Sequence, residues 1–216
     1  MFKEIFKKSF NANTSKDAYT YLVTNALVDK LHSTDKLVEI TGMDFESTYN
    51  KDILPSMIYT FKYKADNTNT IGKVEFSDIV PLILCFTNEN GYITGLNFNY
   101  MPNSTRADLL DIIYTAYKEF YENKLSDAVK KGIAIINNEF ANFLIHDETR
   151  EKFLDILTDK LSFNVRQTYR KYKKSKIQDA RLIEFDMWKY IPLLTFKDSI
   201  RGASLSDLQK QIISNK

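Results

Sequence analysis

Cysteine, histidine and glycine are scarce in this chain of 216 residues, and each scarcity excludes a class of site. Cys85 is the only cysteine, so no disulfide can form within the chain. Two histidines and one cysteine leave too few ligands for a typical Cys/His zinc site. The six glycines form neither a P-loop nor a dinucleotide fingerprint, which argues against the common nucleotide-binding enzymes.

Long apolar runs are also lacking. None approaches the roughly 18 residues that a membrane-spanning helix needs, so we expect no membrane contact. The opening residues, MFKEIFKKSF, are basic but lead into no apolar core, so we expect no secretory signal. Lysine and arginine total 30 against 28 acidic residues. Any nucleic-acid contact therefore has to come from a local patch rather than from the net charge.

The candidate catalytic residues lack the neighbours that catalysis requires. His32 and His146 fall at the ends of predicted helices, away from any nucleophile motif, and we expect them to interact with helix-terminal carbonyls. Cys85 lies within an apolar strand and is interpreted as a small buried hydrophobic residue. We therefore expect no enzyme, no cofactor and no metal ion.

Alternating apolar residues predict strands in the first half of the chain. Gly95 inside the last of them indicates a bulge or a close backbone approach, and Pro81 requires an edge or bulge position. The sequence Asn88-Glu89-Asn90-Gly91 predicts a hairpin turn, because Asn and Gly accept positive φ at little cost. The strands are expected at 57–63, 74–76, 79–86 and 92–100, with a polar loop at 66–72 and a short strand at 37–41.

Helical periodicity dominates the second half. Leu109, Leu110 and Ile113 form one apolar stripe, and Phe153, Ile156 and Leu157 form another. Helices are expected at 14–33, from a cap at Asn103 or Ser104, at 126–145, from Asp147, at 165–174 and at 204–214. The fold class is then α+β in a single domain, 1–216, with a small bent β-barrel or sheet. The β region spans 37–101 and 181–196, an inserted helical region spans 103–175, and helices lie at both ends.

A basic run is the strongest local charge signal. On a helix, Arg166, Arg170 and Lys173 would share one face, with Lys174 at its edge. Such a face fits a DNA backbone, an acidic neighbouring subunit, or a solvated surface with no partner, and the sequence leaves all three open. The cations of the run are Arg166, Arg170, Lys171, Lys173, Lys174, Lys176 and Arg181.

A set of motifs in the middle of the chain resembles a family of tailed-bacteriophage virion proteins. The segments are VEFSDIVPLILCF and GYITGLNFNYMPNSTRADLLDIIY, followed by the basic YRKYKKSKI run and an extended segment around Trp188. Ser77 interrupts the aromatic-Asp unit, and Asn99 stands where the pattern has histidine, as in a distant member. The matching residues are Phe76, Asp78, Pro81, Leu82, Gly95, Asn97, Tyr100, Pro102, Arg106, Leu109 and Leu110.

The resemblance implies a structural, non-enzymatic virion protein at the head-to-tail connector or neck, made in the host cytoplasm. Its implied partners are copies of itself in a ring, the portal or other neck and tail proteins, and, non-specifically, double-stranded DNA. The 15 phenylalanines and 13 tyrosines fit a large core and large subunit contacts. The alternative implied by the family is a protein that caps the ends of packaged DNA.

The motif residues also have structural roles that the sequence alone predicts. Asn97 can bind backbone groups in a turn, and Pro102 stops the last strand. Arg106 is poorly placed for the helix dipole, so we expect it to be buried and to hydrogen-bond an acid or a carbonyl of the β region. Asp78 is the natural candidate for that partner.

Overall fold

The structure is a computed structural model that describes residues 53–122, 144–183, 188, 191–192 and 199–214. For residues 114–122 the backbone alone is described. The predicted helix at 14–33 and the predicted strand at 37–41 lie outside these ranges. So do almost all of the predicted helix at 126–145 and most of the extended segment at 181–196.

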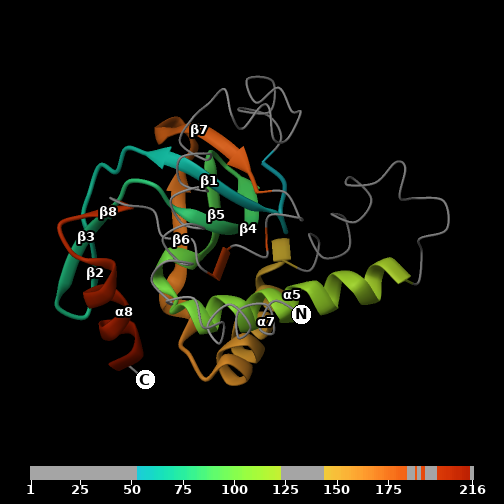
Figure 1. Cartoon of the computed structure of the whole chain (residues 1–216). Helices are drawn as coiled ribbons and strands as arrows, with labels where there is room; N and C mark the ends of the chain where they lie inside the picture. The colour runs from blue at the N-terminus through green and yellow to red at the C-terminus, as the bar shows by residue number, and fades with distance from the viewer. Residues whose placement is uncertain (1–52, 123–143, 184–187, 189–190, 193–198, 215–216) are drawn as a thin grey trace, which may run out of the picture.

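Two antiparallel sheets form the β region, so the predicted α+β class is confirmed (Figure 1). The strands predicted at 57–63 and 74–76 are present, but the predicted polar loop contains a short strand, β2. The smaller sheet has the order β2 (Asn69–Ile71), β3 (Val74–Asp78) and β8 (Ile200–Arg201). The larger sheet has the order β6 (Tyr169–Lys173), β5 (Tyr92–Asn97), β4 (Leu82–Glu89), β1 (Ile58–Tyr63) and β7 (Ile177–Leu182).

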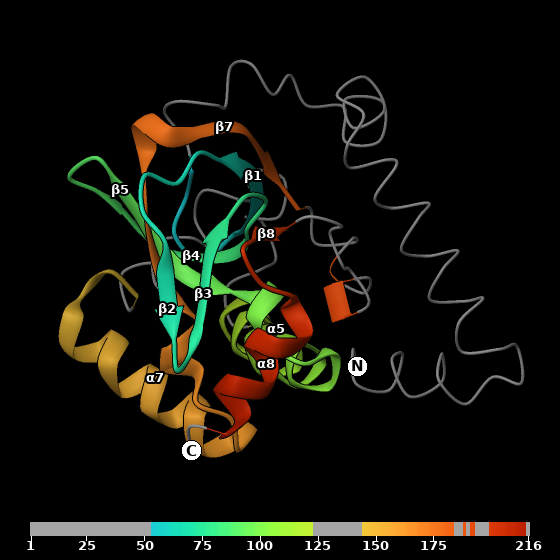
Figure 2. The same ribbon diagram turned by 90° about the vertical axis from the view of Figure 1, so that its left-hand side faces the viewer.

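The larger sheet is curved because its two edge strands follow each other in the chain. Three residues of 3-10 helix, η3 (Lys174–Lys176), join β6 to β7. In a flat five-stranded sheet the edges would lie about 19 Å apart, whereas this link spans about 14 Å at most. The sheet therefore curls (Figure 2), but within the described residues β6 and β7 do not pair, and no closed barrel forms. Of the two predicted forms, the sheet is found and the barrel is not.

The β4–β5 hairpin forms where the sequence predicts it. Asn90 and Gly91 have φ values of 50° and 76°, and Glu89 pairs with Tyr92 across the turn. The predicted return strand at 92–100 is too long, because β5 ends at Asn97 and a 3-10 turn, η1 (Phe98–Tyr100), follows. In η1 the side chain of Asn97 accepts a hydrogen bond from the backbone N–H of Asn99, which favours the turn over further extension.

Three helices pack around the sheets in the described part. They are α5 (Asn103–Glu122), α7 (Asp147–Leu161) and α8 (Leu205–Ser214). α7 begins at Asp147 as predicted, with two acids in its first turn. Ser204 caps α8 by accepting a hydrogen bond from the Asp207 N–H at 3.1 Å. α5 begins at Asn103. With Asn103 or Ser104 as the cap, the first helical residue would instead have been 104 or 105.

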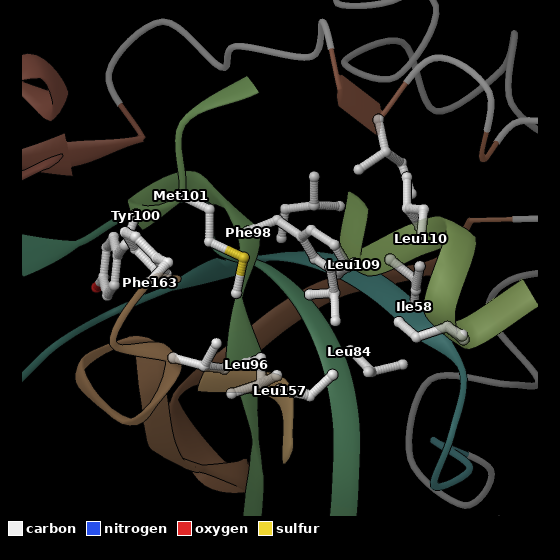
Figure 3. Packing of buried hydrophobic residues seen from close by; sticks show 14 of the residues in the cluster. Ile58, Leu84, Leu96, Phe98, Tyr100, Met101, Leu109, Leu110, Leu157 and Phe163 are labelled. Atoms are coloured by element: carbon white, nitrogen blue, oxygen red, sulfur yellow. The ribbon is translucent and has the colours of Figure 1, made fainter. Parts of the chain in front are cut away.

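The core has two clusters, one on each face of the larger sheet, so β4 is buried on both faces as predicted. The main cluster joins this sheet to α5, α7 and α8 (Figure 3). Leu109, Leu110 and Ile113 are buried as predicted, and so are Phe153 and Leu157. Ile156, which was predicted to share their stripe, is not buried: it is 47% exposed and lies on the solvent side of α7.

The predicted basic helix at 165–174 is wrong. The segment forms a 3-10 turn, η2 (Val165–Thr168), then β6, then η3. The edge of β5 supplies a five-residue ladder from Tyr92↔Lys173 to Leu96↔Tyr169, and Tyr172 is buried between the exposed Lys171 and Lys173. This long-range pairing outweighs the helix propensity of Arg, Lys and Gln. The β region accordingly resumes at residue 169, not 181.

Candidate functional site

Gly95 brings β4 and β5 unusually close together. It lies opposite Cys85, next to a break in the ladder register between Cys85 and Thr87. A Cβ on Gly95 would lie 2.1 Å from the carbonyl oxygen of Leu84. Both predicted features, a bulge and a close backbone approach, are therefore present, and they set the path of β5 into the following turn.

A buried polar cluster forms where β3, β5, η1 and β6 meet. Its members are Asp78, Asn97, Tyr100 and Tyr172, each at most 1% exposed. The Tyr100 hydroxyl donates to Asp78 Oδ1 at 2.5 Å, and the Tyr172 hydroxyl donates to Oδ2 at 3.1 Å. Asn97 Nδ2 donates to Asp78 Oδ1 at 3.3 Å and to the Tyr172 hydroxyl at 2.9 Å. Three donors from three elements thus converge on one carboxylate.

Arg170 covers this polar cluster without joining its hydrogen bonds to Asp78. Its guanidinium lies 4.8 Å from the centre of the Tyr100 ring and 5.9 Å from that of Phe76, and its Nη1 donates to the Tyr169 carbonyl at 2.7 Å. A cation over an aromatic face is attracted by the ring quadrupole. Arg170 is half-buried, and its described contacts lie within the protein.

Burial governs the ionisation of the polar cluster. Loss of solvation raises the pKa of Asp78, while the hydrogen bond from Tyr100, the charge of Arg170 and the hydrogen bond from Tyr172 oppose the rise. Burial also raises the pKa of Tyr100 and Tyr172 well above the usual 10, and the nearby Asp78 carboxylate adds to it. Both hydroxyls therefore stay protonated as donors to Asp78 at neutral pH.

Arg106 is buried as predicted, at 1% exposure, but Asp78 is not its described partner. Arg106 Nε donates to the Met101 carbonyl at 2.9 Å, and its NH2 group donates to the Asn99 carbonyl at 3.3 Å. Gln209 of α8 donates to the same two carbonyls, at 3.1 Å and 3.0 Å. Burial lowers the pKa of Arg106 to about 10. Arg106 therefore fastens the turn η1 to α5, while Gln209 fastens it to α8.

Replacing Arg106 with alanine is expected to lower the free energy of unfolding by about 2–4 kcal/mol, through a cavity and through lost hydrogen bonds. Arg106→Met should cost less, about 1–2 kcal/mol, because it keeps the stem and removes the buried charge. In a Gln209→Ala background, Arg106→Ala should cost about 1 kcal/mol more than in the wild type, because both carbonyls then lose both donors. Urea titration of the four proteins measures this coupling, and strict additivity would contradict it.

The two prolines of the motif have structural positions. Pro81 is buried immediately before β4, not at an edge or bulge within it, and its carbonyl accepts from Thr60 Oγ1 at 3.0 Å. Pro102 precedes α5, and its carbonyl accepts the N–H of Arg106 at 3.0 Å. These motif residues, like the polar cluster, are bonded to the protein itself.

The basic run does not form one surface. Arg166 binds two acids of α7, Glu151 and Asp155, the latter at 2.7 Å, and these hydrogen bonds raise its pKa. Arg170 covers the polar cluster, and Arg181 is only 7% exposed. Lys171 lies over the ring of Tyr92, 4.2 Å from its centre. Of the predicted contact residues, only Lys173, Lys174 and Lys176 gather in one place.

These three lysines meet a fourth, Lys64, at the link between β6 and β7. We call Lys64, Lys173, Lys174 and Lys176 the lysine corner. The Lys64 N–H donates to the Lys176 carbonyl at 3.0 Å, which brings the end of β1 to η3. Lys64, Tyr172 and Gln209 were not predicted from the sequence, because each meets its neighbours only through tertiary contacts. The alternation Lys171-Tyr172-Lys173 was the available sign that Tyr172 points inward.

The remaining candidates have structural environments. Cys85 is fully buried, which raises the pKa of its thiol, and its Sγ donates to the Thr87 carbonyl at 3.5 Å. His146 is exposed just before α7, and its ring makes no capping hydrogen bond. Among the described residues, no three His, Cys, Asp or Glu side chains are grouped to hold a metal ion. No helix in the described ranges has the length and apolar character of a membrane span.

Comparisons with protein-family models, with curated proteins and with solved structures found no match to this chain.

Proposed function

We propose that this chain is a structural, non-enzymatic virion protein of a tailed bacteriophage, acting in the head-to-tail connector or neck as a subunit of a homo-oligomeric ring. The proposal rests on the resemblance of the motif segments to that family. Its partners would be copies of itself and the portal or other neck and tail proteins, and its place would be the head-to-tail junction or the tail.

The observation that supports this role best is the state of the motif residues. Asp78, Asn97, Tyr100 and Arg106 are buried and hydrogen-bonded within the protein. A motif that binds a substrate would leave polar atoms accessible, whereas a motif that specifies a rigid scaffold is satisfied internally. The pattern shared with the family thus favours a common scaffold rather than a common reaction site.

A second candidate, a protein that caps the ends of packaged DNA, is favoured by the lysine corner. Lys64 and Lys173 are exposed there, and Lys174 is half-buried. This role and the ring role differ in stoichiometry, because a closed ring requires many identical subunits and a DNA end requires one or two.

The copy number in purified particles distinguishes the two roles. Quantitative mass spectrometry with isotope-labelled peptides of this chain is expected to find about a dozen copies per particle if it forms a cyclic ring. One or two copies would favour the DNA-end cap. Absence of the chain from purified particles would contradict both, and a known major capsid protein in the same sample calibrates the count.

A further inference from the structure

The lysine corner is built from three separate segments with a fixed backbone. Lys64 follows β1, Lys173 ends β6, and Lys174 and Lys176 lie in η3. The Lys174 N–H donates to the Gly91 carbonyl at 2.9 Å, and the Lys173 N–H donates to the Tyr63 hydroxyl at 3.3 Å. Within the described part, the link η3 between β6 and β7 lies on the side away from α7 and α8 (Figures 1 and 2).

The positive charge of the corner exceeds the negative charge that the described residues place beside it. Asp66 binds Lys176 Nζ at 2.7 Å, and its pKa is lowered first by this hydrogen bond, then by the charges of Lys176, Lys173 and Lys64. Lys64, Lys173 and Lys174 take part in none of the ion pairs described for residues 53–122, 144–183 and 199–214. Lys176, Lys173 and Lys64 thus act on one described carboxylate, Asp66, and Lys174 adds a fourth positive charge in η3.

Protection of a sheet edge does not account for this arrangement. Lysines on an edge strand discourage pairing with other chains, which explains Lys171 and Lys173 on β6. Lys174 and Lys176 lie beyond the strand in η3, and Lys64 lies beyond the end of β1. A further reason is needed for gathering these three at the same point.

The choice of lysine indicates the chemistry of the partner. The arginines of the basic run interact within this chain: Arg166, though exposed, pairs with acids of α7, the half-buried Arg170 stacks on Tyr100, and Arg181 is largely buried. The cations left at the corner are all lysines, which are depleted at protein–protein interfaces, where arginine is enriched. Lysine is a compact charge on a flexible stem, suited to phosphates met in any register. A duplex backbone fits this surface better than an acidic subunit does.

We propose that the lysine corner, Lys64, Lys173, Lys174 and Lys176, contacts the phosphate backbone of duplex DNA without sequence preference. The inference rests on the proposed virion function, in which packaged DNA is the polyanion at hand. On this proposal, the lysine corner is the part of the surface that faces the DNA, while Arg166 and Arg170 are structural residues and do not bind DNA.

The test is binding of the purified full chain to 30-bp DNA duplexes of two unrelated sequences, measured by fluorescence anisotropy over a range of salt concentrations. Lys64→Gln, Lys173→Gln and Lys174→Gln are combined in one variant, which leaves the Lys176–Asp66 pair intact. We expect Kd to rise roughly 10- to 100-fold, equally for both sequences, and the slope of log K against log salt to fall in magnitude by about 2–3.

The matched control combines Lys73→Gln, Lys160→Gln and Lys210→Gln, which remove the same charge from exposed positions on the β2–β3 turn, α7 and α8. Its Kd should stay within about twofold of the wild type. No DNA binding by the wild type, an equal loss in the control, or corner-dependent binding of polyglutamate but not DNA would each overturn the inference. Particle copy number is measured separately, so failure here leaves the proposed structural role standing.

Discussion

Asp78→Ala is expected to lower the free energy of unfolding by about 3–5 kcal/mol, among the largest effects of any single substitution in this protein. The change removes the acceptor of Tyr100, Tyr172 and Asn97 together and leaves these donors buried. Four elements, β3, β5, η1 and β6, lose their common contact. Chemical denaturation followed by far-UV circular dichroism measures the loss.

Asp78→Asn is the matched control, because it keeps the shape and one acceptor oxygen. The amide oxygen can still accept from Tyr100 and Asn97, while the amide nitrogen faces the Tyr172 hydroxyl and one hydrogen bond is lost. We expect a cost of about 1–2 kcal/mol. Equal costs for the alanine and asparagine variants would contradict a stabilising role for the two hydrogen bonds, from Tyr100 and Asn97, that the amide oxygen keeps.

The difference in stability between the wild type and Asp78→Asn should depend on pH. The pKa of Asp78 in the folded protein is raised above 3.8, so folded chains hold a proton that unfolded chains have lost. The stability associated with Asp78 is therefore complete below about pH 3.8 and is lost as pH rises through the folded pKa. Relative to the asparagine variant, the wild type should become less stable over that window and then level off. A difference that is flat with pH would contradict the raised pKa.

Gly95→Ala is the second substitution with a large expected effect, about 3–5 kcal/mol. The new Cβ would lie 2.1 Å from the Leu84 carbonyl oxygen, a backbone atom that no rotamer change can move. The overlap between this Cβ and the Leu84 carbonyl oxygen can be removed only if β4 and β5 separate within the larger sheet. Thermal and urea unfolding measure the loss, and the variant is expected to fold poorly at 37 °C.

Gly91→Ala is the control in the same hairpin. Gly91 has a φ of 76°, yet a Cβ there would meet nothing within 4 Å. It therefore tests backbone strain without steric overlap and should cost about 1 kcal/mol. If Gly95→Ala were no more harmful than Gly91→Ala, the close approach of the two strands would be wrong.

Local signals were sufficient for several elements. The Asn90-Gly91 turn needs only two residues that tolerate positive φ, and both have it. α7 and α8 begin at the acids and at the serine cap that the sequence displays. The same residues that are visible in the sequence make the interactions that fix these elements, so no distant contact was needed to predict them.

Burial of the motif was predictable, but its partners were not. The sequence placed Arg106 in the interior, while the carbonyls that it binds belong to Asn99 in η1 and to Met101 just after it, where the pattern predicted a strand ending at residue 100. Asp78 binds Tyr172, which lies 94 residues further along the chain. A side chain's need for a partner is local chemistry, whereas the choice among partners depends on how the chain folds back on itself.

Local sequence patterns were enough to predict the α+β class, the β4–β5 hairpin, the starts of α7 and α8, and the burial of Arg106. That the segment at 169–173 is a strand depends on long-range contacts, because its ladder is formed with β5, more than 70 residues earlier. The same pairing divides the basic run among the Arg166 ion pairs, the stack of Arg170 on Tyr100 and the lysine corner. Helix propensity acts over a few residues with tenths of a kcal/mol each, and a five-residue ladder on β5, with Tyr172 buried, exceeds it.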